Sequence, residues 1–239
     1  MLEKSMSLID SDKNKEKILK KFLEISAIEN CSEEILQKAI IESGFDPKLK
    51  DIFFENGLID LFDFAFDLLN QEMLKEIAKI DLSNLGISGK IREFMKVRLE
   101  LISKNYQSFR QIIFYLKHNP KSLAFSLKKS YQFADLAWYE IGDKSTDYNF
   151  YSKRILLSKI HLKTFSFFSK EKSADQALSY FDNQIKNILK FTKIKTEIKE
   201  IFSNISSDNC GDNLTYGKEF VNKQFQKLPF IRLYYNGRK

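Results

Sequence analysis

The chain has 239 residues, of which 43% are hydrophobic and 30% are charged, and it contains only three Pro and eight Gly. A chain of this length can bury a hydrophobic core, and the scarcity of Pro and Gly favours long helices with short connections. No stretch reaches the roughly 18 uninterrupted apolar residues of a membrane-spanning helix, so none is predicted. The two Cys, Cys31 and Cys210, are far apart and suggest no disulfide framework, which fits a reduced intracellular setting.

The net charge of +7 is unevenly distributed. Residues 1–150 carry 22 Lys and Arg against 24 Asp and Glu, whereas residues 151–239 carry 17 against 8. The excess of positive charge therefore belongs to the C-terminal part. An anionic partner, whether a lipid headgroup or a protein, should meet that part first.

Apolar residues recur at helical spacing along most of the chain, and no alternation typical of strands competes with them. Ser32 and Asp46 are suitable N-caps, and Pro47 suits a first helical turn. The Gly/Ser-rich residues 81–90 predict a loop. The predicted fold class is all-α, with helices over 14–29, 33–43, 47–54, 58–80, 91–104, 108–117, 121–141 and 147–168 and a further long helix that starts near 175.

The chain is expected to divide into five segments. These are a disordered lead (1–13), a helix-turn-helix-like N-terminal part (14–56), a helical body (57–202), a polar linker (203–213) and an amphipathic helix with its tail (214–239).

The first three helices, followed by an all-helical remainder, resemble the arrangement of TetR-type regulators, so DNA binding has to be considered. Residues 29–55, however, hold seven acids and three Lys, and a DNA-reading module needs a basic face to neutralise phosphates. The candidate recognition helix "DPKLKDIFFEN" offers no Arg, Gln, Ser or Thr for base edges. We therefore predict that the chain binds no nucleic acid.

The segment after the linker places Val221, Phe225 and Leu228 on one helical face, with Lys223 and Lys227 beside it. One interpretation is a last core helix that docks on the body. The other is an interfacial helix whose apolar face enters the headgroup region while its Lys side chains flank it. The linker, the charge and the aromatic content favour the second, so these five residues are predicted to associate with a membrane.

Signals of catalysis are weak. The two His, His118 and His161, have no neighbours at metal-ligand spacing, and the chain has neither a Gly-rich phosphate loop nor a nucleophile elbow. Asp143 and Asp147 lie four residues apart across a turn, where a helix-capping role for Asp147 explains the spacing better than acid–base chemistry. We expect a protein that is not an enzyme and that uses no cofactor and no metal.

The stretch "AWYEIGDKSTDYNFYSKR" at 137–154 differs from the rest of the chain in its density of aromatic and turn-forming residues. Gly142 suits the C-cap of an incoming helix, and Ser145, Thr146 and Asp147 can cap the outgoing one. This leaves a group of aromatic residues without a role: Trp138, Tyr139, Tyr148, Phe150 and Tyr151. Either they pack the corner between two long helices, or they form a surface typical of protein-binding hot spots.

The same stretch resembles the hallmark of the coenzyme Q biosynthesis accessory family known as COQ nine. That family carries a Trp and then Ala-Gly-Asp-x-Ser-Thr-Asp-Phe-Asn-Trp-Tyr-Thr-(Lys/Arg)-Arg. This chain has Trp138 and then "IGDKSTDYNFYSKR" at 141–154. It departs from the family in Ile141 for Ala, in Phe150 for the second Trp, and in "ENCS" at 29–32 for a Gly-Trp-Thr before the second helix.

The resemblance implies a TetR-like fold, an apolar pocket for an isoprenoid lipid or quinone intermediate, and a terminal helix that touches the membrane surface. It also implies that the protein presents its ligand to the di-iron demethoxyubiquinone hydroxylase of ubiquinone biosynthesis. The expected location is cytoplasmic and peripheral on the inner membrane of a bacterium, or on the matrix side if mitochondrial. A divergent TetR-type regulator with a hydrophobic ligand and a helical adaptor without lipid are the alternatives. A homodimer is one expected assembly.

Carried onto this sequence, the resemblance gives two sets of candidate residues. The partner-binding patch is Trp138, Tyr139, Asp143, Ser145, Thr146, Asp147, Tyr148, Asn149, Tyr151 and Arg154. Lipid-binding residues, chosen from the apolar helix faces, are Phe125, Leu156, Ile160, Phe165, Leu178, Phe181 and Ile185.

Overall fold

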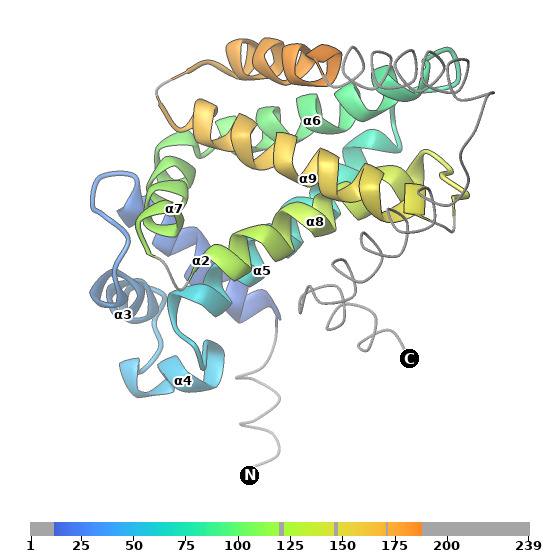
Figure 1. The fold of residues 1–239 in the computed structure, drawn as a ribbon. Coiled ribbons are helices and arrows are strands. Elements are labelled where there is room, and N and C mark those ends of the chain that lie inside the picture. The colour runs from blue at the N-terminus through green and yellow to red at the C-terminus, as the bar shows by residue number, and fades with distance from the viewer. Residues whose placement is uncertain (1–11, 120–121, 146–147, 171, 188–239) are drawn as a thin grey trace, which may run out of the picture.

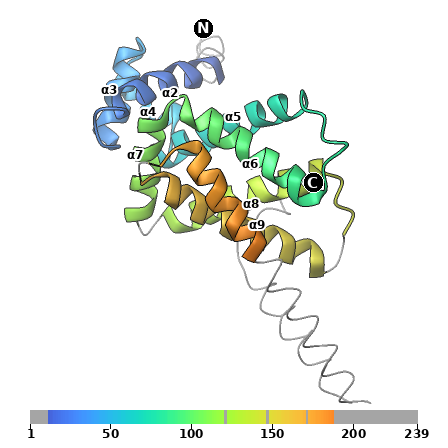
Figure 2. The same cartoon turned by 90° about the horizontal axis from the view of Figure 1, so that it is seen from above.

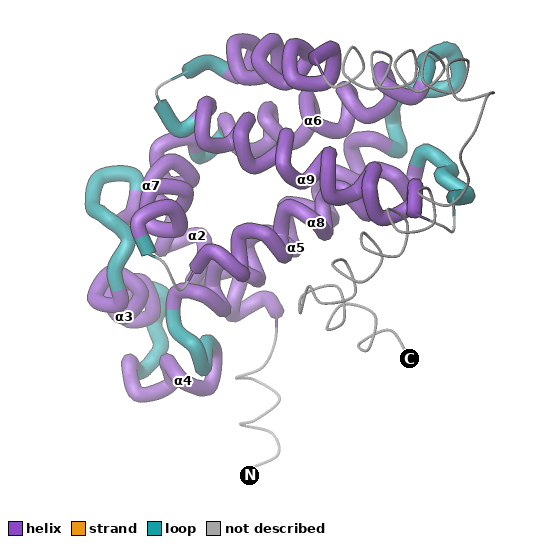
Figure 3. The backbone as a smooth tube through the Cα atoms, viewed as in Figure 1, coloured by secondary structure: helices purple, strands orange, loops and turns teal. Residues whose placement is uncertain are grey.

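The computed structural model describes residues 12–119, 122–145, 148–170 and 172–187. Within these residues every regular element is a helix, so the predicted all-α fold class is confirmed (Figure 3). None of the helices in the described ranges combines the length and the apolarity needed to cross a bilayer. The TetR-like arrangement stays a prediction.

The helices follow one another in the order that hydrophobic spacing predicts (Figure 1). They are α2 (Asp12–Ser26), α3 (Glu33–Glu42), the 3-10 turn η1 (Pro47–Leu49), α4 (Lys50–Phe53), α5 (Leu58–Ile77), α6 (Ile87–Ser103), α7 (Tyr106–His118), α8 (Leu123–Glu140), α9 (Tyr148–Phe168) and a last helix over 174–187.

Two boundaries differ from prediction in an informative way. The loop predicted over 81–90 ends at Gly86, because α6 starts at Ile87 and its first backbone hydrogen bond joins Lys90 N to Gly86 O at 2.9 Å. Ser88 and Gly89 are weak helix formers, but they fall in the first turn, where the backbone N–H groups have no intrahelical partner in any case. The predicted helix over 47–54 starts as the 3-10 turn η1 before α4.

The N-terminal part is held by capping interactions that the sequence predicts. Ile35 N donates to Ser32 Oγ at 3.3 Å at the start of α3. Lys48 N donates to Asp46 Oδ1 at 2.9 Å at the start of η1. The helices α2, α3 and α4 gather at one end of the molecule, away from α6, α8 and α9 (Figure 2).

A single carboxylate joins α3 to the start of α5. Glu33 accepts a hydrogen bond from Leu58 N at 3.0 Å and pairs with Lys50 Nζ at 2.9 Å. Gly57, which precedes α5, has a φ of +60°, and a Cβ there would lie 2.3 Å from Glu33 Oε1. The backbone conformation of Gly57, with φ +60° and ψ −129°, favours glycine, and a side chain there would also displace the Glu33 carboxylate.

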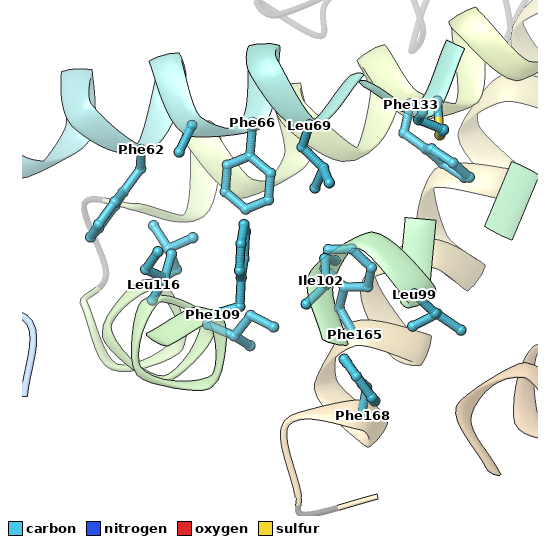
Figure 4. Packing of buried hydrophobic residues seen from close by; sticks show 14 of the residues in the cluster. Phe62, Phe66, Leu69, Leu99, Ile102, Phe109, Leu116, Phe133, Phe165 and Phe168 are labelled. Atoms are coloured by element: carbon cyan, nitrogen blue, oxygen red, sulfur yellow. The ribbon is translucent and has the colours of Figure 1, made fainter. Parts of the chain in front are cut away.

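The core lies between the long helices and is rich in Phe. In Figure 4, Phe62 and Phe66 of α5 project toward side chains of α7, and Leu69 projects toward Ile102 of α6. The rings of Phe66 and Phe109 meet edge to face with centroids 6.3 Å apart, a geometry that aromatic pairs favour. The many Phe of this chain therefore have a structural use.

The last described helix packs on the body. It lies beside α6 in Figure 1, where Arg92 Nε contacts Asp182 Oδ2 at 3.0 Å. The ring of Tyr180 stacks on that of Phe167, near the end of α9, with centroids 4.5 Å apart. Leu178 and Phe181 are buried beneath it.

Candidate functional site

The predicted motif forms the corner between α8 and α9. Gly142 ends α8 with a φ of +82°, and nothing lies within 4 Å of the position its Cβ would take. Gly142 N donates to Tyr139 O at 3.0 Å, and Asp143 N donates to Trp138 O at 3.0 Å. This is the pair of hydrogen bonds that closes a helix through a left-handed residue, so the predicted C-cap role of Gly142 is present in the structure.

Asp143 is the centre of the corner. Its carboxylate accepts hydrogen bonds from Ser145 Oγ at 2.8 Å, Lys153 Nζ at 2.8 Å and Arg154 Nη1 at 3.1 Å. Burial raises the pKa of this carboxyl, but the hydrogen bonds from Lys153, Ser145 and Arg154 outweigh burial and lower the pKa to about 2. The charged carboxylate thus ties the turn to the first two turns of α9.

Arg154 links α9 to α8 and to the turn between them. Its buried guanidinium donates from Nε to Asp135 Oδ1 at 2.6 Å and from Nη1 to Phe150 O at 3.1 Å, besides its bond to Asp143. It also lies over the ring of Phe150, 3.4 Å from the centroid. A buried Arg with two carboxylate partners is well compensated, and removal of either carboxylate would leave charge poorly paired.

These contacts divide the predicted partner-binding patch. Asp143 and Arg154 are buried inside the corner, Ser145 caps Asp143, and Tyr151 is half-buried. Trp138 packs against the core and is covered by Lys153, whose Nζ lies 5.0 Å from the indole. Tyr139 is the residue of this group that reaches far into solvent. Thr146, Asp147 and the side chains of Tyr148 and Asn149 lie outside the described residues.

A second candidate site is an apolar cavity of about 380 Å3 enclosed by α5, α7, α8 and α9. It is lined by Phe66, Ile113, Leu116, Lys117, Asn119, Leu123, Phe125, Ser126, Lys129, Ser130, His161, Leu162, Phe165 and Ser166. Two of the residues predicted to bind lipid, Phe125 and Phe165, line this cavity. Of the other five predicted residues, Ile160, Leu178 and Phe181 are core residues, Ile185 is partly buried, and Leu156 is exposed.

Two polar residues of the cavity wall, His161 and Ser130, are hydrogen-bonded to each other. His161 Nδ1 lies 2.8 Å from Ser130 Oγ, and its ring stacks on Phe133 with centroids 4.3 Å apart. Burial, reinforced by the charge of Arg98, holds the pKa of His161 well below its ordinary value, so the ring is neutral. Sequence reasoning missed His161, because a single His among Lys residues on a helix gives no distinctive signal.

Lys129 is buried in the cavity wall, and its positive charge is compensated by two carboxylates that do not line the cavity. Its Nζ contacts the carboxylates of Asp63 and Asp67 on α5, each at 2.6 Å. The ion pairs turn the ammonium toward α5, so the cavity face of α8 stays mainly apolar. The acids that interrupt the apolar run of α5 in the sequence therefore anchor α8 against it.

Arg98 is the most deeply buried cation described. Its Nη1 donates to Asn70 Oδ1 at 2.6 Å, and its guanidinium lies 4.9 Å from the ring centroid of Phe133. Burial lowers its pKa to about 9. The burial of Arg98 is indicated by the sequence, because Arg98 falls on the apolar helix face that Ile91, Met95 and Ile102 define.

The residues predicted to associate with a membrane, Val221, Lys223, Phe225, Lys227 and Leu228, lie outside the described part of the chain.

Fold and site together define an all-α protein with an apolar cavity inside its helical body and a polar corner between two of the helices that enclose it. Residues 123–192, which include this corner, match the COQ9 family model. A similar curated protein is the "probable ubiquinone biosynthesis protein coq9, mitochondrial" of Dictyostelium discoideum, with 26% identity over 192 residues. The alignment covers 77% of this chain and 62% of that protein's length. Both matches support the resemblance to the COQ9 family that the 138–154 motif carries.

Proposed function

We propose that this chain is a non-catalytic lipid-binding accessory protein of ubiquinone biosynthesis. It takes an isoprenoid quinone intermediate from the membrane, shields it in the cavity between α5, α7, α8 and α9, and presents it to the di-iron demethoxyubiquinone hydroxylase. The observation that carries the proposal is an apolar cavity of about 380 Å3, most of whose lining residues belong to the segment that matches the COQ9 family model.

The size and the chemistry of the cavity suit such a ligand. Small-molecule sites commonly have volumes of about 300 to 1,000 Å3, with mostly apolar walls and a few polar groups that set orientation. Burial of an isoprenoid tail against Phe66, Phe125 and Phe165 would contribute about 25 cal/mol for each Å2 of apolar surface removed from water. The cavity holds part of a long tail, while the rest remains near its opening.

The polar groups of the wall are suited to a neutral head group rather than to an anion. His161 is neutral and bonded to Ser130, and Lys129 is already paired with Asp63 and Asp67. A quinone or phenol offers oxygen atoms that accept or donate single hydrogen bonds, and it requires no buried countercharge. This argues for an uncharged isoprenoid over a fatty acid.

The contact with the hydroxylase is proposed to lie on the outer face of the α8–α9 corner. Tyr139 is 71% exposed there, and aromatic side chains are enriched among residues that dominate binding energy. The buried Asp143 and Arg154 act by holding that surface in shape.

Mass spectrometry of organic extracts from protein purified without detergent tests the proposal. Co-purified isoprenoid quinones or their precursors, at a substantial molar fraction, are the expected result. A protein that carries no isoprenoid, and that takes none up when a quinone precursor is added back, would contradict it.

A further inference from the structure

Two of the residues that line the cavity are exposed, and they indicate where it opens. Most of its lining residues are buried or half-buried, but Leu123, at the start of α8, is 62% exposed, and Lys117, near the end of α7, is also exposed. The opening therefore lies beside the junction of α7 and α8. A ligand that enters the cavity passes these two side chains.

A second hollow of about 420 Å3 adjoins this opening, because Lys117 borders both. It lies on the next face of α7, against the end of α9, and is lined by Asn30, Arg110, Gln111, Phe114, Lys117, His118, Ser169 and Lys170. Phe114 is 54% exposed there, and its ring lies against His118 with centroids 4.0 Å apart. Large apolar side chains and cationic side chains therefore lie near one another around the opening.

The helices around the opening contain no acid on this side. Residues 106–134 and 148–170 include no Asp or Glu, whereas Lys163 and Lys170 are exposed near the cavity wall of α9. The two acids of α5 that reach toward α8, Asp63 and Asp67, are paired with Lys129. Apart from Glu29, which is paired with Lys38, and Glu171, which follows Lys170 in the sequence, the charged residues near the opening are therefore cationic.

The combination fits the surface of an anionic bilayer. Aromatic and aliphatic side chains enter the boundary between headgroups and acyl chains, while Lys side chains beside them contact the anionic headgroups. A surface that recognises a nucleic acid would gain from the cations, but it would have no use for two exposed apolar side chains beside an apolar cavity.

We propose that the surface formed by Phe114, Lys117, His118, Leu123 and Lys170, here called the opening surface, docks on an anionic bilayer. Docking in this orientation turns the cavity toward the membrane, so that a lipid moves between them without crossing water. The purpose of the docking rests on the proposed function, but the docking itself does not.

Co-flotation of the full-length chain with phosphatidylcholine vesicles that contain or lack phosphatidylglycerol tests this proposal. The double variant Phe114→Ser/Leu123→Ser should lower the fraction bound to the anionic vesicles by about fivefold, because both apolar anchors are lost. Lys117→Glu/Lys170→Glu should also lower binding and should weaken its dependence on phosphatidylglycerol. Ile87→Ser is the matched control, since Ile87 is 60% exposed and lies at the start of α6, a helix that lines neither hollow.

A fluorescence measurement separates this surface from any contribution of residues 214–239. In Phe114→Trp, vesicles with brominated lipids should quench tryptophan emission well beyond the quenching seen for the parent, whose single Trp is Trp138. Ile87→Trp should match the parent. The proposal is overturned if Phe114→Trp is quenched no more than Ile87→Trp, or if the Ser double variant floats like the parent.

The outcomes keep this proposal apart from the proposed function. Lost flotation of the variants in a chain that carries no isoprenoid would contradict the lipid-carrier function and leave the docking standing. Unchanged flotation of the variants in a chain that carries isoprenoid would contradict the docking and leave the lipid-carrier function standing. Binding that depends on the Lys residues but not on Phe114 and Leu123 would point to an acidic macromolecule and overturn the proposal.

Discussion

At the scale of single residues, the carboxylate of Asp143 controls the corner between α8 and α9. It accepts hydrogen bonds from three side chains, one within the turn and two from α9. Its pKa of about 2 in the folded protein lies below the ordinary value of 3.8. The ionised form is therefore favoured by folding, and its stabilising effect is present above pH 4 and lost as the pH falls toward 2.

The low pKa of Asp143 predicts how the stability of the protein changes in acid. Asp143→Asn should lower the unfolding free energy at pH 7 by about 2 kcal/mol, and the difference from the parent should shrink as the pH falls from about 5 toward 2. Urea denaturation of both proteins at a series of pH values measures it. Two stability curves that stay parallel over that range would show that Asp143 is not a stabilising anion.

Two neighbouring aromatic residues should behave differently. Trp138 packs against the core, so Trp138→Ala should destabilise the protein by roughly 2 kcal/mol. Tyr139 is exposed, so Tyr139→Ala should change stability by less than about 0.5 kcal/mol but weaken hydroxylase binding by on the order of 2 kcal/mol. Thermal unfolding and titration with the hydroxylase measure the two effects. A Tyr139→Ala protein that binds like the parent would remove this face from the contact.

At the scale of elements, the joint between α3 and α5 depends on one glycine. Gly57→Ala would place a Cβ against Glu33 and force a side chain into positive φ, so it should cost about 2 to 3 kcal/mol. Gly44 is the matched control, because its φ is also positive, at +82°, but nothing lies near its Cβ position. Gly44→Ala should cost about 1 kcal/mol. Equal losses in urea denaturation would mean that the contact with Glu33 is unimportant.

Elements were more predictable than sites, for a physical reason. Apolar spacing reports that a residue faces inward, which is enough to place a helix such as α8 or α9. It does not report whether the inward space is filled, so Phe125 at the cavity and Phe181 in the core look alike in the sequence. The 138–154 motif was recognisable, but its division into buried Asp143 and exposed Tyr139 depends on how α9 turns back on α8, which spacing does not specify.

At the scale of the whole molecule, the charged groups are placed so that the cavity interior stays mainly apolar and cations lie near its opening. Acidic side chains of α5 compensate Lys129 from outside the cavity, and the acid-free stretches of α7, α8 and α9 surround its opening. The corner at Asp143 and Arg154 holds α8 and α9 together where they diverge to enclose the cavity. The proposed carrier role needs each of these features: an apolar interior, an opening and a rigid outer face.

The most direct test of the carrier role is a binding isotherm for a ubiquinone analogue with a short isoprenoid tail. Ser126 lines the cavity, whereas its neighbour Ala124 on α8 is exposed. Ser126→Trp should fill the cavity and weaken binding by about tenfold or more, with Ala124→Trp as the control that binds like the parent. Saturable binding that is lost only in Ser126→Trp, with both variants folded by circular dichroism, is the predicted result. Equal affinity of Ser126→Trp and the parent would contradict the assignment of the cavity as the lipid site.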